Sequence, residues 1–509
     1  MKNLIVIFAI LFILVSGCSQ PVPEVPDTSE KDGALAALDS ARDEIFNAET
    51  KGNNVTEAVT RMNEAQLAFN AGNYTTATSL AGAAKYLALN SKPLVTKQNE
   101  TPDIVPPDVI SDKINWSEDI KLSSDIAVHK SFNNANSILV DQNGVIHTVW
   151  YSINDGKDEI HYRRSTDGVT WGEDTILSTG PNFVGEVSIT TDRGHEFQSG
   201  SNSAANPALA ISGSNVYVAW RSDLNSVQDN TNGEIYFKKS TDSGVNWGPE
   251  VRLTNAPEDS FSPSISASGN ILYVVWMDMR DGYGDLYFKY SPNAGTIWSS
   301  DLRLTEATSF RGQPTIIGSG NDVHAFWMDN REANWEIFFD HSKNGGAIWD
   351  GASRFTNDMG TSEVPVVARV GNTIYVAWTD SRPIGNENYA DAYEIYLRKS
   401  TDGGKTWSNE IPLTNSPKWS GDPSIAAVGT QVHVVWPDGR DGSKSNSEIY
   451  HKYSLDGGSS WSDDIRITYA DKDSVIPSIA VLGSNVYVLW EDTRGGKSEI
   501  FYKHGVFNG

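Results

Sequence analysis

Seven copies of one sequence unit occupy the chain from about residue 113 to its end. Each copy holds a short apolar strand, a second strand that ends in Trp, a third strand, and a tight turn with a second Trp before a fourth strand. Alternating apolar residues between Gly-rich turns are typical of half-buried antiparallel strands. Four strands per repeat match the blade of a propeller. The sequence therefore predicts an all-β, seven-bladed β-propeller, with the second-strand tryptophans at Trp150, Trp220, Trp276, Trp327, Trp378, Trp436 and Trp490.

The two ends of this repeat array complement each other. The seventh unit stops soon after its third strand, Glu499–Lys503, so it lacks a fourth strand. Residues Asn115–Ser123 align with the turn and fourth strand of the sixth unit, Ser460–Thr468. An open array would leave sheet edges exposed, and closing the ring removes them. We therefore expect the N-terminal strand to complete the last blade.

The tight turn has the pattern S-x-D-x-G-x-x-W, which resembles the Asp box of sialidases and related propellers. It occurs at Ser240–Trp247, Ser291–Trp298, Ser342–Trp349, Ser400–Trp407 and Ser454–Trp461, and one residue shorter at Ser165–Trp171. We predict a structural role, in which the acid or amide accepts turn N–H bonds and the Trp packs between sheets. The residues at the acid position are Asp167, Asp242, Asn293, Asn344, Asp402 and Asp456.

The resemblance implies sialidase activity, but the sequence departs from that pattern. Sialidases are six-bladed and bind a carboxylate through three arginines, one of them in an Arg-Ile-Pro-like motif on the first inner strand. The matching segment here, residues 136–140, has neither Arg nor Pro, and the pair Arg382-Pro383 lies in a turn. No spacing singles out a catalytic Tyr, Glu and Asp set. A binding propeller is therefore favoured over an enzyme.

A turn with the pattern W-x-D-x-R follows the second strand in five blades, from Asp278/Arg280 to Asp492/Arg494. Catalytic sets are usually asymmetric, so five copies favour structural ion pairs that join neighbouring blades. Carboxylates at Asp278, Asp281 or Asp441 would also suit Ca²⁺. No dense run of calcium ligands is present, so the sequence predicts no cofactor and no metal site.

Insertions into the repeat are better guides to function, because loops on a rigid scaffold carry binding residues. The distance from Trp171 to Trp220 is 49 residues, against 29 in five other blade steps. This insertion holds the candidate catalytic residues Asp192, Arg193, His195 and Glu196. Residues near the face that carries the W-x-D-x-R turns (the Asp/Arg-turn face) are candidate ligand contacts, namely Tyr283, Trp335, Tyr389, Asp391 and Trp419.

The N-terminal segment predicts secretion and lipid attachment. Residues 1–18 combine Lys2, an apolar run and the sequence Val15-Ser16-Gly17-Cys18, which resembles a lipoprotein lipobox. Cys18 is the only cysteine, so lipidation would account for an unpaired thiol. An uncleaved signal anchor is the alternative. Residues 19–29 read as a tether, 30–91 as a small α-helical hairpin or three-helix spacer, 92–112 as a Pro-rich linker and 113–509 as the propeller.

The chain's charge narrows the choice of partners. Its net charge of −25 repels phosphate backbones, so a nucleic-acid partner is not expected. We expect a surface lipoprotein, held at the membrane by its lipid outside the cytoplasm, whose propeller binds an extracellular glycan or protein. The alternatives are a sialidase-like exo-acting glycoside hydrolase and an envelope assembly or docking factor.

Overall fold

The computed structural model divides the chain into two compact units, Met1–Asp108 and Val109–Gly509, which are described separately. It describes isolated helical residues between 30 and 69, and residues 73–91, 114–123, 128–130, 136–154, 157–178, 189–190, 196–197, 205–222, 232–282, 284–306, 310–331, 334–358, 360–382, 393–441 and 446–507. No helix within these residues is long and apolar enough to span a bilayer.

The first unit contains the helix α3 (Tyr74–Leu89). Its N-terminus is capped by Asn73, whose side-chain oxygen accepts a hydrogen bond from the Thr76 N–H at 3.2 Å. Four alanines spaced three or four residues apart form one buried face of the helix, as the period of an α-helix requires. They pack against buried residues from the preceding helical stretches, and together these residues are Leu38, Ala41, Ala58, Met62, Ala65, Ala77, Ala81, Ala84 and Ala88.

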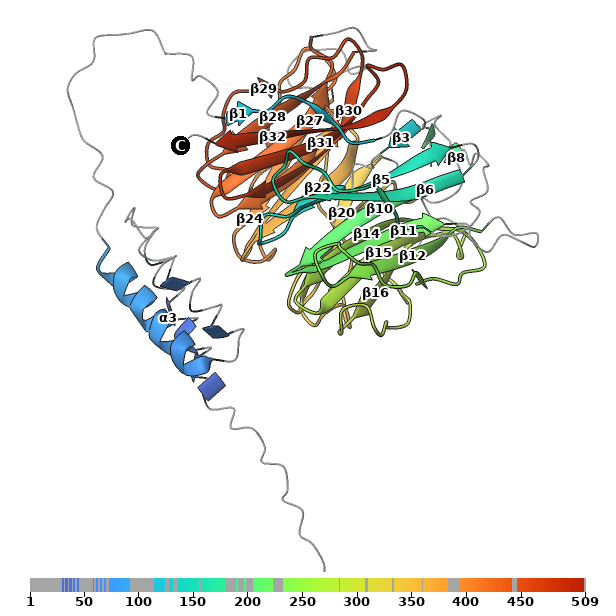
Figure 1. Cartoon of the computed structure of the whole chain (residues 1–509). Coiled ribbons are helices and arrows are strands. Elements are labelled where there is room, and N and C mark those ends of the chain that lie inside the picture. The colour runs from blue at the N-terminus through green and yellow to red at the C-terminus, as the bar shows by residue number, and fades with distance from the viewer. Residues whose placement is uncertain are drawn as a thin grey trace, which may run out of the picture. The chain divides into compact units, whose positions relative to one another are not determined.

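The second unit is a seven-bladed β-propeller of four-stranded antiparallel sheets, which confirms the predicted fold (Figure 1). Blade one contains β3 (Val128–Lys130), β4 (Ile138–Val140), β5 (Ile146–Asn154), β6 (Lys157–Ser165) and β7 (Thr175–Ile176). Blade two contains β10 (Ala205–Ser212), β11 (Asn215–Ser222), β12 (Glu234–Ser240) and β13 (Val251–Arg252). The insertion before blade two holds a two-stranded sheet, β8 (Ile189–Thr190) and β9 (Glu196–Phe197).

Blades three to six repeat the same order of four strands. Blade three is β14 (Ser260–Ser268), β15 (Ile271–Asp278), β16 (Asp285–Ser291) and β17 (Leu302–Arg303). Blade four is β18 (Arg311–Ser319), β19 (Asp322–Asp329), β20 (Glu336–Ser342) and β21 (Ser353–Arg354). Blade five is β22 (Ser362–Val370), β23 (Thr373–Asp380), β24 (Glu394–Ser400) and β25 (Ile411–Pro412). Blade six is β26 (Ser424–Val428), β27 (Gln431–Asp438), β28 (Glu448–Ser454) and β29 (Ile465–Arg466).

Blade seven combines both ends of the propeller sequence. It contains β30 (Ser474–Leu482), β31 (Asn485–Asp492) and β32 (Glu499–Phe507), and its outer positions are β1 (Ile114–Trp116) and β2 (Ile120–Lys121). Both N-terminal strands pair with β32, and Figure 1 shows blue-green β1 beside red β32. The predicted closure of the ring by the N-terminal strand is therefore confirmed.

The core lies between the blades. The described part of the propeller has seven clusters of buried apolar side chains, and each cluster joins two neighbouring blades. The one that joins blade seven to blade one contains Ile138, Trp150, Leu489 and Ile500. All seven second-strand tryptophans are fully buried. A continuous ring of such clusters explains why neighbouring sheets hold together although no strand ladder connects them.

The first strand of each blade faces the middle of the ring. Serines on these inner strands accept hydrogen bonds from backbone N–H groups of the next blade, for example Ser266 from Gly318 at 3.0 Å. Another such bond runs from Ser137 N–H to Ser478 Oγ at 3.1 Å, across the closure. Inner strands of blades one to six line a central cavity of about 140 Å³. The described inner strands therefore surround a small cavity at the centre of the ring.

Candidate functional site

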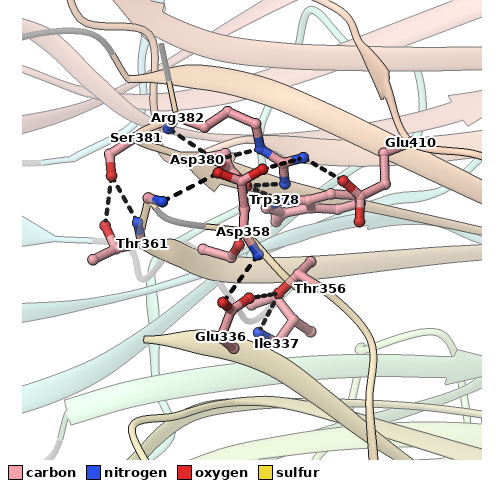
Figure 2. Close-up of polar contacts among 12 residues, drawn as sticks. Glu336, Ile337, Thr356, Asp358, Thr361, Trp378, Asp380, Ser381, Arg382 and Glu410 are labelled. Atoms are coloured by element: carbon pink, nitrogen blue, oxygen red, sulfur yellow. Dashed lines mark hydrogen bonds and ion pairs between the residues drawn. The ribbon is translucent and has the colours of Figure 1, made fainter. Parts of the chain in front are cut away.

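The W-x-D-x-R turns form a repeated structural unit on one face of the propeller. In blade five, Asp380 is fully buried and accepts hydrogen bonds from Trp378 Nε1 at 2.8 Å and from Arg382 Nε at 2.8 Å (Figure 2). The guanidinium of Arg382 also lies 4.3 Å from the ring centre of Tyr396. Blades three, four, six and seven repeat the Trp–Asp bond, the Asp–Arg pair and the stacked ring. This repetition supports a structural role.

These ion pairs act within a blade, which corrects our expectation that they join neighbouring blades. Arg440 Nη1 donates to Asp464 at 2.7 Å, and Asp464 directly precedes the fourth strand of the same blade. Burial raises the pKa of Asp438, but hydrogen bonds from Arg440 and Trp436 outweigh burial and hold the pKa below its ordinary value. Arg440 therefore fastens the second strand to the fourth strand of blade six.

The carboxylates that we considered for Ca²⁺ are engaged by protein groups. Asp278 pairs with Arg280 and also accepts a hydrogen bond from Ser260 at 2.9 Å. Asp281 and Asp441 each accept a hydrogen bond from a tyrosine hydroxyl and contact an arginine of the fourth strand. The geometry gives each of these three carboxylates a structural partner.

The S-x-D-x-G-x-x-W turns lie at the opposite ends of the strands. Asp242 Oδ1 accepts hydrogen bonds from Ser240 Oγ at 2.7 Å and from Asn246 N–H at 2.8 Å. The backbone N–H of Asn246, the side chain of Asn246 and Ser240 lower the pKa of Asp242 to about 2. The turn Trp247 packs edge-on against Tyr162 of the preceding blade, 4.8 Å between ring centres. The equivalent acid or amide oxygen accepts a hydrogen bond from a turn N–H at Asp167, Asn293, Asn344, Asp402 and Asp456.

Blade five departs from a second repeated pair on the Asp/Arg-turn face. In blades two, three, four, six and seven a buried acid at the start of the third strand pairs with a basic residue on the fourth, as Glu336 does with Arg354 at 2.5 Å, whereas blade one has Ile176 at the basic position. Glu336 also accepts a hydrogen bond from Thr356 at 2.6 Å (Figure 2). In blade five, Pro412 stands in place of the arginine. Burial raises the pKa of the corresponding acid, Glu394, to about 7.

A second departure lies next to Glu394 and involves Glu363, Tyr393 and Asp422, which we call the blade-five cluster. Burial raises the pKa of Glu363 to about 7, and the nearby Asp422 carboxylate acts in the same direction. Burial also raises the pKa of Tyr393, and Glu363 adds to that rise. A hydrogen bond from Thr361 partly offsets both shifts. A buried carboxyl group with a raised pKa and a specific charged neighbour is typical of functional sites.

The backbone brings these residues together. Ser362 pairs with Asp380, and Asp380 pairs with Glu394, so these three residues form one row across the sheet. Glu363 follows Ser362 and Tyr393 precedes Glu394, so both residues lie next to this row. Asp422 has a left-handed φ of 48° just before Pro423, a conformation shared by the equivalent residues Asn206, Ser262, Gln313, Val364 and Ile476. Its N–H donates to Thr379 Oγ1 at 2.9 Å, and Thr379 is paired with Glu363. The inner strand β22 that carries Glu363 also lines the central cavity at Val366.

Among the predicted ligand contacts, Trp419 lies beside the blade-five cluster. Its indole is half-buried and packs against Gly421, where an added Cβ would be 2.5 Å from the ring. The neighbouring Ser420 N–H donates to the carbonyl of Tyr393 at 2.9 Å. Trp335, by contrast, is only 5% exposed and packs edge-on against Phe310. Trp335 therefore offers little surface to a ligand.

The other candidates lie outside the described residues: Asp192, Arg193, His195, Tyr283, Tyr389 and Asp391, together with Cys18. Glu196 is described only as part of the backbone of strand β9.

Sequence reasoning missed Glu363, Tyr393, Glu394 and Asp422. Two signals were present: an acid in the second position of an inner strand, where blades three and seven have Phe261 and Val475, and the loss of an arginine at Pro412. Both signals require comparison of the blades at single positions of the repeat.

The raised pKa of Glu363 predicts a pH-dependent effect on stability. An unfolded Glu titrates near pH 4.5, so the folded chain binds more protons between about 4.5 and 7, and stability falls as the pH rises through that window. Glu363→Gln removes this penalty. We expect the variant to match the parent at pH 4 and to exceed its unfolding free energy at pH 8 by on the order of 2 kcal/mol. Urea denaturation at both pH values measures the difference, and an equal difference at both would contradict the assignment.

The fold and this cluster define a seven-bladed β-propeller with an acidic site on its Asp/Arg-turn face.

No protein-family model and no curated protein matches the sequence. Solved structures with similar folds include a sialidase mutant of Trypanosoma rangeli with trans-sialidase activity, which is 15% identical to this chain with a TM-score of 0.41. The match covers 63% of this chain and 56% of the sialidase chain. An α-L-arabinofuranosidase of Fusarium graminearum is 13% identical, with a TM-score of 0.41 and coverages of 75% and 97%. The polysaccharide lyase Uly1 is 11% identical, with a TM-score of 0.48 and coverages of 77% and 100%. The chain thus spans little more than half of the sialidase.

Proposed function

We propose that the propeller binds an extracellular glycan at the blade-five cluster, with Trp419 as the aromatic contact. The observation that carries this proposal is an asymmetric group of one tyrosine and two carboxyl groups beside a half-buried indole, at a position where the other blades do not repeat these residues. Sugar rings present both apolar faces and hydroxyl groups, so they suit a flat aromatic side chain next to hydrogen-bonding groups.

The charge of the site sets the class of glycan. The carboxylates of Glu363 and Asp422 accept hydrogen bonds from sugar hydroxyls or ammonium groups. The arginine of the W-x-D-x-R turn in the same blade, Arg382, is already paired with Asp380 and Glu410. A carboxylated sugar would therefore meet like charges without a free guanidinium to pair with. The ligand that this site favours is a neutral or amino-sugar glycan rather than a sialylated one.

Replacement of Trp419 by Ala tests this proposal. We expect the full chain to bind neutral or amino-sugar oligosaccharides on a glycan array, and Trp419→Ala to weaken that binding at least tenfold, about 1.4 kcal/mol, because the aromatic contact is lost. Ile348→Ala is the matched control, because it removes an exposed apolar side chain from an S-x-D-x-G-x-x-W turn on the opposite face. Selective binding of sialylated glycans, or unchanged binding by Trp419→Ala, would contradict the proposal.

Hydrolysis of a glycosidic bond is the second candidate function, and the raised pKa of Glu363 favours it. A carboxyl group that stays protonated near neutral pH can donate a proton to a leaving oxygen, and Asp422 provides a second carboxyl group beside it. The release of reducing ends from the glycans that bind distinguishes the two functions. Hydrolysis lost in Glu363→Gln with binding retained would identify an enzyme, whereas binding without any release would identify a binding propeller.

We further propose that the chain is displayed outside the cytoplasm by a lipid on Cys18. Support comes from the apolar leader, the small residues before Cys18 and the absence of any other cysteine in the sequence. A surface position would place the propeller where extracellular glycans occur. Mass spectrometry of the mature protein provides the test, because an unmodified residue 18 or an uncleaved leader would overturn this proposal.

A further inference from the structure

Blade four departs from the repeat on the face of the S-x-D-x-G-x-x-W turns, through Asp322, His324 and His341. Asp322 begins strand β19, and His324 is paired with His341 of β20 across the sheet. The same three positions in blade two are Asn215, Tyr217 and Lys239. Blade four therefore combines two imidazoles and a carboxylate where another blade of the same fold has none of them.

The three side chains converge. His341 Nε2 lies 2.5 Å from Asp322 Oδ1, and the rings of His324 and His341 are stacked with centres 4.1 Å apart. One potential ligand atom from each of the three residues lies within 4.8 Å of the other two. A metal ion about 2.0–2.2 Å from nitrogen and oxygen ligands holds neighbouring ligand atoms roughly 3.3 Å apart. The planes of the two stacked rings differ by 13°, so one imidazole must rotate to direct its nitrogen at the same ion.

His324 provides an independent observation. Its side chain is fully buried, and neither ring nitrogen makes a hydrogen bond of normal distance and angle, although the backbone of Gly403 lies near. A buried polar atom without a partner costs roughly 1–3 kcal/mol. Coordination of a metal ion by one of these nitrogens would remove part of this cost.

The surroundings resemble the outer shell of a metal site. His341 Nδ1 lies 3.4 Å from Asp350 Oδ2, which would orient the ring and leave Nε2 for a metal, as carboxylates behind ligating histidines do. Arg369 Nη2 binds Asp322 Oδ2 at 2.6 Å and leaves Oδ1 toward the histidines. The positive charge of Arg369 lowers the affinity for a cation but fixes the carboxylate. The Asp322 side chain is 29% exposed, so an ion can enter from its side.

We propose that Asp322, His324 and His341 form a binding site for a transition-metal ion, with Zn²⁺ as the preferred metal. Two imidazole nitrogens and one carboxylate oxygen suit Zn²⁺, whereas Ca²⁺ and Mg²⁺ prefer sites made only of oxygen ligands. Three protein ligands leave a fourth position for water or an external ligand.

The repeat itself supplies a variant that should fold. Asp322→Asn, His324→Tyr and His341→Lys together give blade four the residues of blade two. His504→Gln is the control, because His504 stacks on Tyr487 at the same position in blade seven beside Asn485, without a carboxylate or a second histidine. Circular dichroism of both variants checks that the propeller forms.

Isothermal titration of the untagged full chain with ZnCl₂, after treatment with a chelator, tests the site. We expect one equivalent of Zn²⁺ to bind and to raise Tm by about 3 °C at saturation, with no such effect from CaCl₂ or MgCl₂. The triple variant should lose at least roughly 100-fold in Zn²⁺ affinity, whereas His504→Gln should bind as the parent does. No stoichiometric binding by the parent, or equal binding by the folded triple variant, would overturn the proposal.

Discussion

A chain that begins at residue 124 should fail to form a stable propeller, whereas a chain that begins at Val109 should melt at the same temperature as the propeller of the full chain. The two differ only in the segment that contains β1 and β2. Deleting it removes Ile114 and Leu122, which are 1% and 2% exposed. Burial of each such side chain contributes about 1.5–3 kcal/mol.

The deleted segment also neutralises charges of blade seven. Asp119 pairs with Arg494 and Lys503, each at 2.8 Å, and Lys121 pairs with Glu499 at 2.6 Å. These side chains are 10–30% exposed, so loss of each pair costs less than the roughly 3–5 kcal/mol of a fully buried pair, against a native stability of order 5–15 kcal/mol. Strand β32 would also present an unpaired edge that promotes aggregation. Size-exclusion chromatography and thermal melts compare the two chains, and equal melting temperatures would show that the closing strand is dispensable.

Asp438→Ala should lower the unfolding free energy by about 3–5 kcal/mol. The fully buried carboxylate accepts hydrogen bonds from Trp436 Nε1 at 3.1 Å, Ser420 Oγ at 2.8 Å and Arg440 Nη2 at 2.6 Å. Alanine leaves these donors without their acceptor and leaves the guanidinium without its closest counter-charge. Asp463→Ala, an exposed acid in the same blade, is the control and should change stability by less than about 0.5 kcal/mol.

The effect of Asp438→Ala should shrink in acid. The folded-state pKa of Asp438 lies below the ordinary value, so its stabilising contribution is complete above about pH 4 and is lost as the pH falls through the folded-state pKa. Urea denaturation followed by tryptophan fluorescence at pH 7 and at pH 3 measures both values. A loss of the same size at both pH values would show that packing, rather than charge, accounts for the effect of the substitution.

The number of blades and the closure of the ring were predictable because each depends on the spacing of a repeated residue. Seven second-strand tryptophans occupy seven sheets, and the alignment of residues 115–123 with 460–468 corresponds to the pairing of Lys121 with Phe501 and of Arg466 with Tyr450. The spacing of a repeated residue can be read directly from a single sequence. We predicted that the Asp–Arg pairs join neighbouring blades, whereas they lie within one blade. The pattern W-x-D-x-R does not reveal that the arginine also contacts an acid just before the fourth strand of its own blade.

The candidate site was less accessible to sequence reasoning. We looked for function in the insertions, whereas Glu363 and Asp422 lie within or beside regular strands and differ from the repeat at single positions. Their effect depends on burial and on a neighbour 59 positions away in the chain, and neither quantity can be read from spacing. Trp335 illustrates the same limit, since an aromatic next to a turn proved to be covered by Phe310.

The sharing of blade seven between the first and last strands has a consequence for biosynthesis. During translation, β1 and β2 are synthesised long before β32, so they have no pairing partner until almost the entire domain has been made. A polypeptide that ends before Glu499 can form several blades but lacks β32, so it cannot close the propeller ring. Completion of the ring therefore requires that β32 has been synthesised, and shorter products expose unpaired sheet edges that promote aggregation.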